Sequence, residues 1–332
     1  MAEPVPVDVV VDGGASGTRV GLVVDGELVH SVRGGTCNPR VVAAERGWQT
    51  LVGLLNEVWA VRPAGVEVPR SIHLALGAIS TAAEAAGTAA VLAGLRESCP
   101  PLRAETGWAM SDVVPLTCYP DDTVAIICGT GSCFAGYRAD APGVRWARAS
   151  GLEYVLADEG SGWDLGARAL RAVVRAADGR GPATALSASA PVALGLEPDC
   201  APERIHELVY GADQQKALVA LAGRAVLREA AEGDAVAGGL VAYAADELLL
   251  GAEACAERVG LPSGSAARYT GSLLLGDEPA LREALLPRLR ASRFAFRPVP
   301  MDADPLQGVR ELAARLLAGT VALDGVELAA RI

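Results

Sequence analysis

The chain opens on short apolar runs separated by turn residues. Val5–Val11 and Val20–Val24 are rich in β-branched residues, and a third run, Glu27–Val32, follows the turn Asp25-Gly26. Short β-branched runs bounded by turns are typical of buried strands, and an Asp-Gly pair between two runs is typical of a hairpin. The pattern therefore predicts three antiparallel strands at the start of the chain.

Further along, apolar positions recur at helical spacing between short apolar runs. Trp48, Leu51, Leu55 and Trp59 share one face of a predicted helix over 41–60. The same reasoning predicts helices over 81–96, 163–177, 212–231, 235–259, 279–289 and 306–317, and strands over 71–78, 108–111, 123–128, 133–138 and 267–274. Irregular chain is expected over 145–156, and a loop or cap over 185–202. This mixture predicts an α/β fold.

The plan of strand, glycine turn and strand occurs twice. The second copy is Gly-Thr-Gly-Ser at 129–132, and Gly14 and Gly131 stand 117 residues apart at equivalent points. Equivalent spacing of this kind indicates an internal duplication. We expect an N-terminal domain over 1–120 and a C-terminal domain over 121–332, with the last helix able to pack back on the first domain.

The first glycine turn, Asp-Gly-Gly-Ala-Ser-Gly-Thr-Arg at 12–19, carries the strongest chemical signal. Three glycines leave backbone N–H groups uncovered, which suits a phosphate, although an ordinary tight hairpin has the same composition. A carboxylate beside a phosphate repels it unless a cation lies between them. Asp12 therefore favours a phosphate loop that works with Mg²⁺.

Composition narrows the class of protein. The 332 residues are 51% hydrophobic and 21% charged, as in a well-packed globular protein, and the formal net charge is −11. The acidic balance argues against nucleic acid or an anionic membrane as the main partner. Seven cysteines without a C-x-x-C pair indicate reduced thiols in the cytosol. No signal peptide or membrane-spanning run is evident, so we expect a cytoplasmic protein. Lys216 is the single lysine.

Four short motifs in this order carry a family resemblance. They are the turn at 12–19, Gly-Thr-Gly-Ser at 129–132, Asp-Glu-Gly-Ser-Gly at 158–162 and Tyr-Thr-Gly-Ser at 269–272. Together they resemble the N-acetylglucosamine kinase branch of the sugar kinase–actin superfamily, which also contains the BadF/BadG/BcrA/BcrD-type ATPases. The resemblance implies two ribonuclease-H-like (actin-like ATPase) domains with a nucleotide and sugar cleft between them.

The resemblance also implies roles for individual residues. It assigns ATP and phosphate contacts to Gly13, Gly14, Ser16, Thr18, Arg19, Gly129, Thr130, Gly131, Ser132, Gly271 and Ser272. It places Mg²⁺ on Asp12 through water. It makes Asp112 the general base, with Asn38, Asp112 and Asp158 on the sugar. Asp112 and Asp158 are alternatively helix caps, and Asn38-Pro39 an ordinary turn.

Three departures from the family pattern fall around the sugar and the phosphates. The segment before the 158–162 motif reads Ser-Gly-Leu-Glu-Tyr at 150–154, where the family has a Gly-Trp-Gly-His-like sequence. Cys133 replaces a common asparagine, and Gly17 replaces a frequent lysine. Glu153 could pair with the ammonium of an unacetylated amino sugar, or be a solvated loop charge. The identity of the sugar and its acetylation stay open.

The first hypothesis is an ATP-dependent phosphotransferase that acts on N-acetylglucosamine or glucosamine at the 6-hydroxyl, with Asp112 as general base. Its partners would be ATP, an amino sugar and a second copy of the chain in a homodimer. An alternative is a BadF-type ATPase that activates a dehydratase or reductase, suggested by Cys118, Cys128 and Cys133. A third hypothesis is a sugar-responsive regulator. The presence of Asp12, Asp112 and Asp158 favours catalysis.

Overall fold

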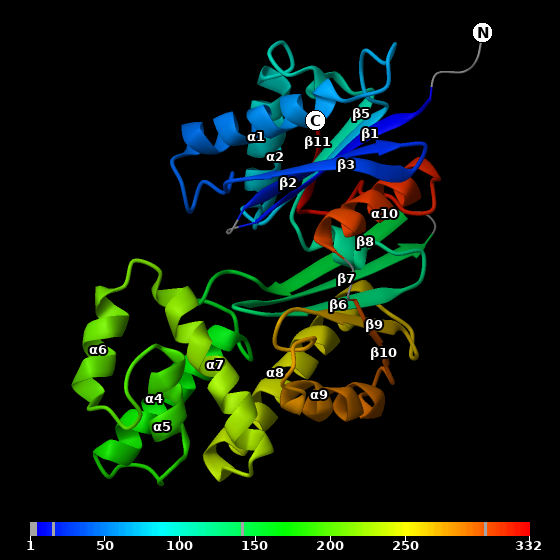
Figure 1. Cartoon of the computed structure of the whole chain (residues 1–332). Helices are drawn as coiled ribbons and strands as arrows, with labels where there is room; N and C mark the ends of the chain where they lie inside the picture. The colour runs from blue at the N-terminus through cyan, green and yellow to red at the C-terminus, as the bar shows by residue number, and fades with distance from the viewer. Residues whose placement is uncertain (1–4, 15–16, 141–142, 302–303) are drawn as a thin grey trace. The chain divides into compact units, whose positions relative to one another are not determined.

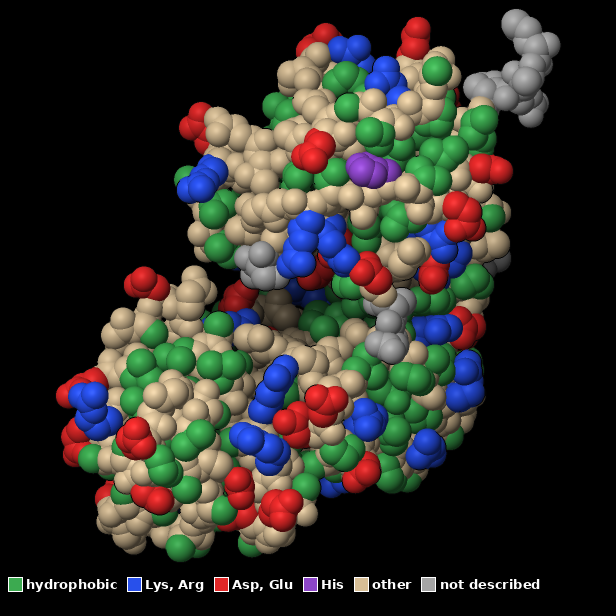
Figure 2. Space-filling model, viewed as in Figure 1, with side chains coloured by type: hydrophobic (Ala, Val, Ile, Leu, Met, Phe, Trp, Pro, Cys, Tyr) green, Lys and Arg blue, Asp and Glu red, His purple; other side chains and the backbone are tan. Residues whose placement is uncertain are grey.

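The computed structural model describes residues 5–14, 17–140, 143–301 and 304–332 (Figure 1). The chain divides into two compact units. Unit 1 comprises Met1–Pro120, Tyr137–Trp146 and Ala303–Ile332, and unit 2 comprises Asp121–Gly136 and Ala147–Asp302. Side chains of both charge signs are interspersed on the face of each unit that Figure 2 shows.

Unit 1 is built on a six-stranded mixed sheet. Its order is β11-β5-β4-β1-β2-β3, formed by β1 (Val7–Gly13), β2 (Thr18–Val24), β3 (Glu27–Gly34), β4 (Ser71–Leu76), β5 (Thr106–Met110) and β11 (Ala329–Arg331). β1, β2 and β3 are antiparallel, as predicted from the opening apolar runs. β4 is parallel to both β1 and β5, and β11 is antiparallel to β5. The carboxyl ends of β1, β4 and β5 therefore lie at the same end of the sheet. Asp12, near the end of β1, and Asp112, just after β5, both lie at this end.

Helices cover both faces of this sheet. They are α1 (Ala44–Ala60), α2 (Ala82–Gly94), the 3-10 turn η1 (Pro100–Arg103), α3 (Val114–Thr117) and α10 (Pro305–Leu317). A Cβ on Gly34 would meet Leu54 of α1, whereas one on Gly21 would meet Leu306 of α10. Gly34 pairs with Thr18, so it faces the opposite side of the sheet from Gly21. α1 and α10 therefore lie on opposite faces (Figure 1).

The second sheet has five strands in the order β10-β9-β6-β7-β8. These are β6 (Thr123–Cys128), β7 (Ser132–Asp140), β8 (Gly143–Ser150), β9 (Ala266–Thr270) and β10 (Arg297–Pro300). β9 runs parallel to β6 and to β10. The helices of unit 2 are α4 (Gly162–Ala177), α5 (Leu186–Ala193), α6 (Pro202–Gly211), α7 (Gln215–Ala231), α8 (Ala235–Val259) and α9 (Ala280–Ala291).

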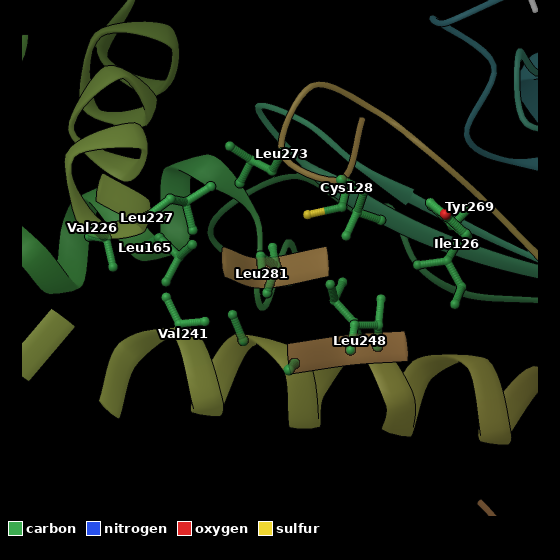
Figure 3. Packing of buried hydrophobic residues seen from close by; sticks show 14 of the residues in the cluster. Ile126, Cys128, Leu165, Val226, Leu227, Val241, Leu248, Tyr269, Leu273 and Leu281 are labelled. Atoms are coloured by element: carbon green, nitrogen blue, oxygen red, sulfur yellow. The ribbon is translucent and has the colours of Figure 1, made fainter. Parts of the chain in front are cut away.

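The core of unit 2 lies between strands of its sheet and the long helix α8 (Figure 3). Val241 and Leu248 of α8 are buried in one cluster with Ile126, Tyr269 and Leu281. By length and composition α8 is the one helix among the described residues that could cross a membrane, which is weak evidence on its own. The burial of one α8 face in this cluster gives the apolar sequence a structural role.

Two local expectations from the sequence are wrong. The segment expected to be irregular contains β8, where Trp146 and Ala147 are buried between arginines that hide the strand pattern. The expected loop over 185–202 contains α5, whose small residues pack against α4 and α7. The pattern also missed α6, β10 and β11. The two strands are too short to show a period, and tertiary packing overrides weak local propensity.

Candidate active site

In unit 1, the β1–β2 hairpin places Asp12 directly opposite Arg19. The guanidinium Nη2 of Arg19 lies 3.2 Å from Oδ2 of Asp12, and its Nη1 pairs with Oδ2 of Asp304. Asp304 is also the N-cap of α10, where it accepts a hydrogen bond from the backbone N–H of Leu306. Burial raises the pKa of Asp12, and Arg19 offsets only part of this rise. Arg19 is thus held between two carboxylates.

The first glycine turn is braced by the segment that follows β3. Thr36 donates its hydroxyl to the carbonyl of Gly14 at 2.7 Å, and the N–H of Cys37 donates to Oγ1 of Thr18 at 3.0 Å. A Cβ on Gly13 would lie 2.7 Å from the side chain of Leu76, so a larger residue would displace its neighbour. The expected phosphate ligand Ser16 lies outside the described residues.

Asp112 follows β5, and its carboxyl group lies beside Gly77, which is hydrogen-bonded to Gly13. Its Oδ2 lies 3.0 Å from where a Cβ of Gly77 would be, and Gly77 donates its N–H to the carbonyl of Gly13 at 2.8 Å. Burial, and then the charge of Asp12, raises the pKa of Asp112. Asp112 keeps an exposed face, so solvent limits this rise. The alternative role as a helix cap is wrong, because the N-cap of α3 is Val113.

Asn38 forms the turn that its sequence suggested. Its Oδ1 accepts the backbone N–H of Arg40 at 2.9 Å, and its carbonyl accepts from Val41 and Val42. The side chain is 7% exposed. Nδ2 makes no hydrogen bond to any residue in the described part of the chain, so this donor remains available to a ligand.

In unit 2, the second glycine turn is tied to Asp158. The N–H of Ser132 donates to Oδ1 of Asp158 at 2.9 Å, and the Ser132 hydroxyl donates to the carbonyl of Glu159 at 2.8 Å. A Cβ on Gly131 would lie 2.6 Å from Oδ1 of Asp158. A side chain at this position would therefore displace the carboxylate or the turn. Thr130 at the tip of the turn is exposed.

The third glycine turn lies beside the second. Gly271 has φ of +104°, and a Cβ on it would lie 2.2 Å from the carbonyl oxygen of Cys128, so glycine is required. Oγ of the exposed residue Ser272 lies 3.7 Å from where a Cβ of Gly129 would be. Unit 2 therefore brings together the motifs at 129–132, 158–162 and 271–272.

The sequence reasoning missed Lys216 of α7. Its Nζ lies 2.8 Å from Oδ2 of Asp158 and 2.7 Å from Oε2 of Glu153. Burial lowers the pKa of Lys216, but the two carboxylates outweigh it and the net pKa is raised. The only available signal was that Lys216 is the single lysine of the chain. Glu153 is therefore already paired with a cation.

Asp158 does not cap the following helix. The N-cap of α4 is Ser161, whose Oγ accepts the N–H of Asp164 at 3.3 Å. Asp158 adopts a left-handed backbone conformation with φ of +73° and is 3% exposed. A buried carboxylate in a strained conformation is typical of a functional position.

The oxygen donors of unit 1 fit Mg²⁺. No group of three or more His, Cys, Asp or Glu side chains that could hold a metal occurs among the described residues. Mg²⁺ is usually held by one or two carboxylates together with waters and substrate phosphates, and Asp12 supplies such a carboxylate. Cys118 and Cys128 are buried, and burial raises the pKa of Cys128 to about 12. A buried neutral thiol is a poor ligand for an iron–sulfur cluster.

The two mixed sheets, with glycine turns at strand ends, define a two-unit protein of the actin-like ATPase fold. Residues 116–285, just over half of the chain, match the BadF/BadG/BcrA/BcrD ATPase family. The chain belongs to this family.

Comparison with known proteins gives both sequence and structural relatives. The chain is 31% identical over 134 residues to the N-acetylmuramic acid/N-acetylglucosamine kinase of Clostridium acetobutylicum, a match over 40% of this chain and 42% of that protein. A candidate N-acetylglucosamine kinase from Chromobacterium violaceum has a similar structure, with a TM-score of 0.66, 24% identity and coverage of 93% and 99% of the two chains. A glucokinase of the ROK family from Streptomyces griseus, in complex with glucose and AMPPNP, gives a TM-score of 0.52, 13% identity and coverage of 93% and 98%. The structural likenesses show the fold.

Proposed function

We propose that the protein is an ATP-dependent kinase that transfers the γ-phosphoryl group to the 6-hydroxyl of an amino sugar. The observation that carries this proposal is the Asp112 carboxyl group, which lies beside Gly77 and Gly13 at the end of the braced phosphate loop. The names of the kinases to which the chain is similar support a sugar as substrate.

In the proposed reaction, Asp112 accepts the proton of the sugar 6-hydroxyl. The hydroxyl oxygen forms a bond to the γ-phosphorus, and the bond from that phosphorus to the bridging oxygen breaks, so ADP leaves with the electron pair. A raised pKa makes Asp112 a better proton acceptor than an ordinary aspartate. Asp12 would hold Mg²⁺ through water, and the ion would offset the charge of the phosphates.

Backbone and side-chain groups of the glycine turns would hold the phosphates. We assign this role to Gly13, Gly14, Thr18 and Arg19 of unit 1 and to Gly129, Thr130, Gly131, Ser132, Gly271 and Ser272 of unit 2. The N–H groups of Gly14 and Gly129 donate to the carbonyls of Gly17 and Gly131, so these two would have to exchange partners. The Thr18 hydroxyl accepts the N–H of Cys37 and keeps its own proton for a phosphate. The N–H and the hydroxyl of Ser132 already donate to Asp158 and Glu159, so Ser132 would have to exchange one of these bonds for a phosphate. Arg19 would have to exchange a carboxylate for a phosphate.

The environment of Glu153 favours an N-acylated sugar over a free amine. Lys216 lies 2.7 Å from Glu153 and neutralises it. A substrate ammonium would have to displace this lysine, whereas a neutral amide would not. N-acetylglucosamine is therefore the preferred substrate of the two that the sequence suggested, with Asn38 and Asp158 as sugar ligands.

The test is ADP release from Mg-ATP with N-acetylglucosamine, glucosamine, N-acetylmannosamine, glucose or no sugar. We expect turnover that requires a sugar, favours N-acetylglucosamine and falls at least a hundredfold in Asp112→Asn. The matched control is Asp25→Asn, in the Asp25-Gly26 turn of unit 1. ATP hydrolysis that ignores every sugar and both substitutions would contradict the proposal. Sedimentation analysis would test the homodimer, which stays a prediction from the sequence.

A further inference from the structure

A pocket of 430 Å³ lies on the α1 and α2 face of the unit 1 sheet. Its end nearest the phosphate loop is formed by Gly13, Asn38 and Leu76, and its far wall by side chains of α1 and α2. Sites for small ligands usually have volumes of about 300–1,000 Å³. The pocket is therefore large enough for part of a substrate, and it lies wholly within one unit.

The pocket begins beside the proposed base. Leu76 and Ala78, which line it, flank Gly77, and a Cβ on Gly77 would lie 3.0 Å from Oδ2 of Asp112. Asn38, with Nδ2 available as a donor, lines the same end. A sugar that contacts both Asp112 and Asn38 would direct one of its substituents into this pocket.

The far wall suits an apolar substituent. It is formed by Trp48, Ile79 and Val91, and Ile79 is 2% exposed. A sugar hydroxyl placed there would lose water without gaining a hydrogen bond on these apolar groups, which is unfavourable. Burial of methylene groups on such a wall is favourable.

Charged groups in the pocket are already satisfied by one another. Of the described residues that line it, Arg40 and Glu84 carry charge, and their nearest N and O atoms are 2.9 Å apart. The second carboxylate oxygen of Glu84 accepts the N–H of Ser80 at 2.7 Å. A substrate ammonium or carboxylate would find its counter-charge engaged, so a neutral group fits best.

The far end of the pocket adjoins further open space. Trp48 also lines a second hollow of 530 Å³, with Glu45, Gln49, Val52, Leu95 and Ser98. Val91 is 40% exposed, so the far end is open. We propose that the pocket binds the acyl group of a 2-N-acylated amino sugar and accepts acyl chains longer than acetyl. This inference rests on the proposed kinase function.

The experiment uses glucosamine carrying N-acetyl, N-propanoyl and N-butanoyl groups, with ADP release as the readout. A buried methylene contributes about 0.8 kcal/mol, so kcat/KM of the wild type should rise about fourfold with each added methylene. Gly87 on α2 lines the pocket, and a Cβ there meets nothing within 4 Å, so Gly87→Leu fills the pocket without a backbone clash. It should lower the butanoyl-to-acetyl ratio of kcat/KM at least tenfold.

The matched control is Gly53→Leu on α1. A Cβ on Gly53 also meets nothing within 4 Å, and Gly53 does not line the pocket. We expect this variant to keep the wild-type ratio, and thermal unfolding to show that both variants fold. Turnover of N-acetylglucosamine with no gain for longer chains, or with equal ratios in the two variants, would overturn this inference alone. Absence of turnover with every sugar would overturn the kinase function, and this inference with it.

Discussion

The Nζ atom of Lys216 lies 2.8 Å from Oδ2 of Asp158, while Oδ1 of the same carboxylate accepts the backbone N–H of Ser132. The Lys216–Asp158 contact is an ion pair. Asp158 is 3% exposed, so its charge depends on these two neighbours. The single lysine of the chain thus compensates the buried carboxylate beside the second glycine turn.

Replacement of Lys216 by methionine should therefore destabilise the protein. The change leaves Asp158 buried without a counter-ion. A fully buried pair loses about 3–5 kcal/mol in such a change, and the partial exposure of Lys216 reduces this to roughly 2 kcal/mol. Thermal unfolding should show a fall in Tm of about 4–8 °C. Lys216→Arg should keep most of the wild-type Tm. An unchanged Tm in Lys216→Met would mean that the Lys216–Asp158 pair contributes nothing to stability.

Asp112→Asn should separate activity from stability. If Asp112 is the base, as proposed, its loss should lower kcat by about a hundredfold to ten-thousandfold. Because the folded protein raises the pKa of Asp112, the charged form costs stability at neutral pH, and that cost disappears as pH falls through the raised pKa. The variant should consequently have a higher Tm than the wild type at pH 7, and the difference should shrink at lower pH. A lower Tm at pH 7 would show that the Asp112 carboxylate stabilises the fold.

Gly131→Ala should damage the second glycine turn. The new Cβ would lie 2.6 Å from Oδ1 of Asp158, so either the turn or the carboxylate must move. We expect KM for ATP and for the sugar to rise at least tenfold. Gly238→Ala in α8 is the control, since a Cβ there meets nothing within 4 Å and should stabilise the helix by up to about 1 kcal/mol. Equal KM values in the two variants would exclude a role for the 129–132 turn in binding.

The parts of the fold that were predicted share a strong local signal. The opening strands are short β-branched runs bounded by turns, and α8 is a long apolar run. The register that places Asp12 opposite Arg19 follows from the turn between the first two runs. The glycines at 13, 131 and 271, which the sequence motifs singled out, each lie where a Cβ would clash with a neighbour.

The parts that were missed depend on contacts distant in sequence. Lys216 and Asp304 reach Asp158 and Arg19 only after the chain has folded, and a lone lysine or aspartate carries no periodicity. The pocket beside Asn38 likewise requires α1 and α2 to lie on the same face of the sheet. A sequence pattern describes neighbours along one element, so it cannot show which elements meet.

His73 should make the stability of the protein sensitive to acid. It lies within β4 at 1% exposure, and neither ring nitrogen has a hydrogen-bond partner among the described residues. Burial lowers the pKa of His73 to about 4, and the opposing effect of Asp8 is smaller. Between pH 6.5 and 4, His73 is therefore protonated in the unfolded chain but stays neutral in the folded protein. About 3 kcal/mol of unfolding free energy should be lost as pH falls across this range.

The measurement is urea unfolding of the wild type and His73→Phe at pH 7, 5 and 4. Phenylalanine has a similar shape and carries no proton, so the variant should lose less stability than the wild type between pH 7 and 4. Parallel pH profiles for the two proteins would assign the acid sensitivity to other groups.

The pairing of Arg19 with Asp304 joins residues that are 285 positions apart. Both belong to unit 1, which also takes its edge strand β11 from residues 329–331. During synthesis, β1 to β5 leave the ribosome well before the helix α10 that covers one face of their sheet. The charge arrangement around the first glycine turn can therefore be completed only after residue 304 has left the exit tunnel, so the Asp12–Arg19 pair exists for most of translation without its third member.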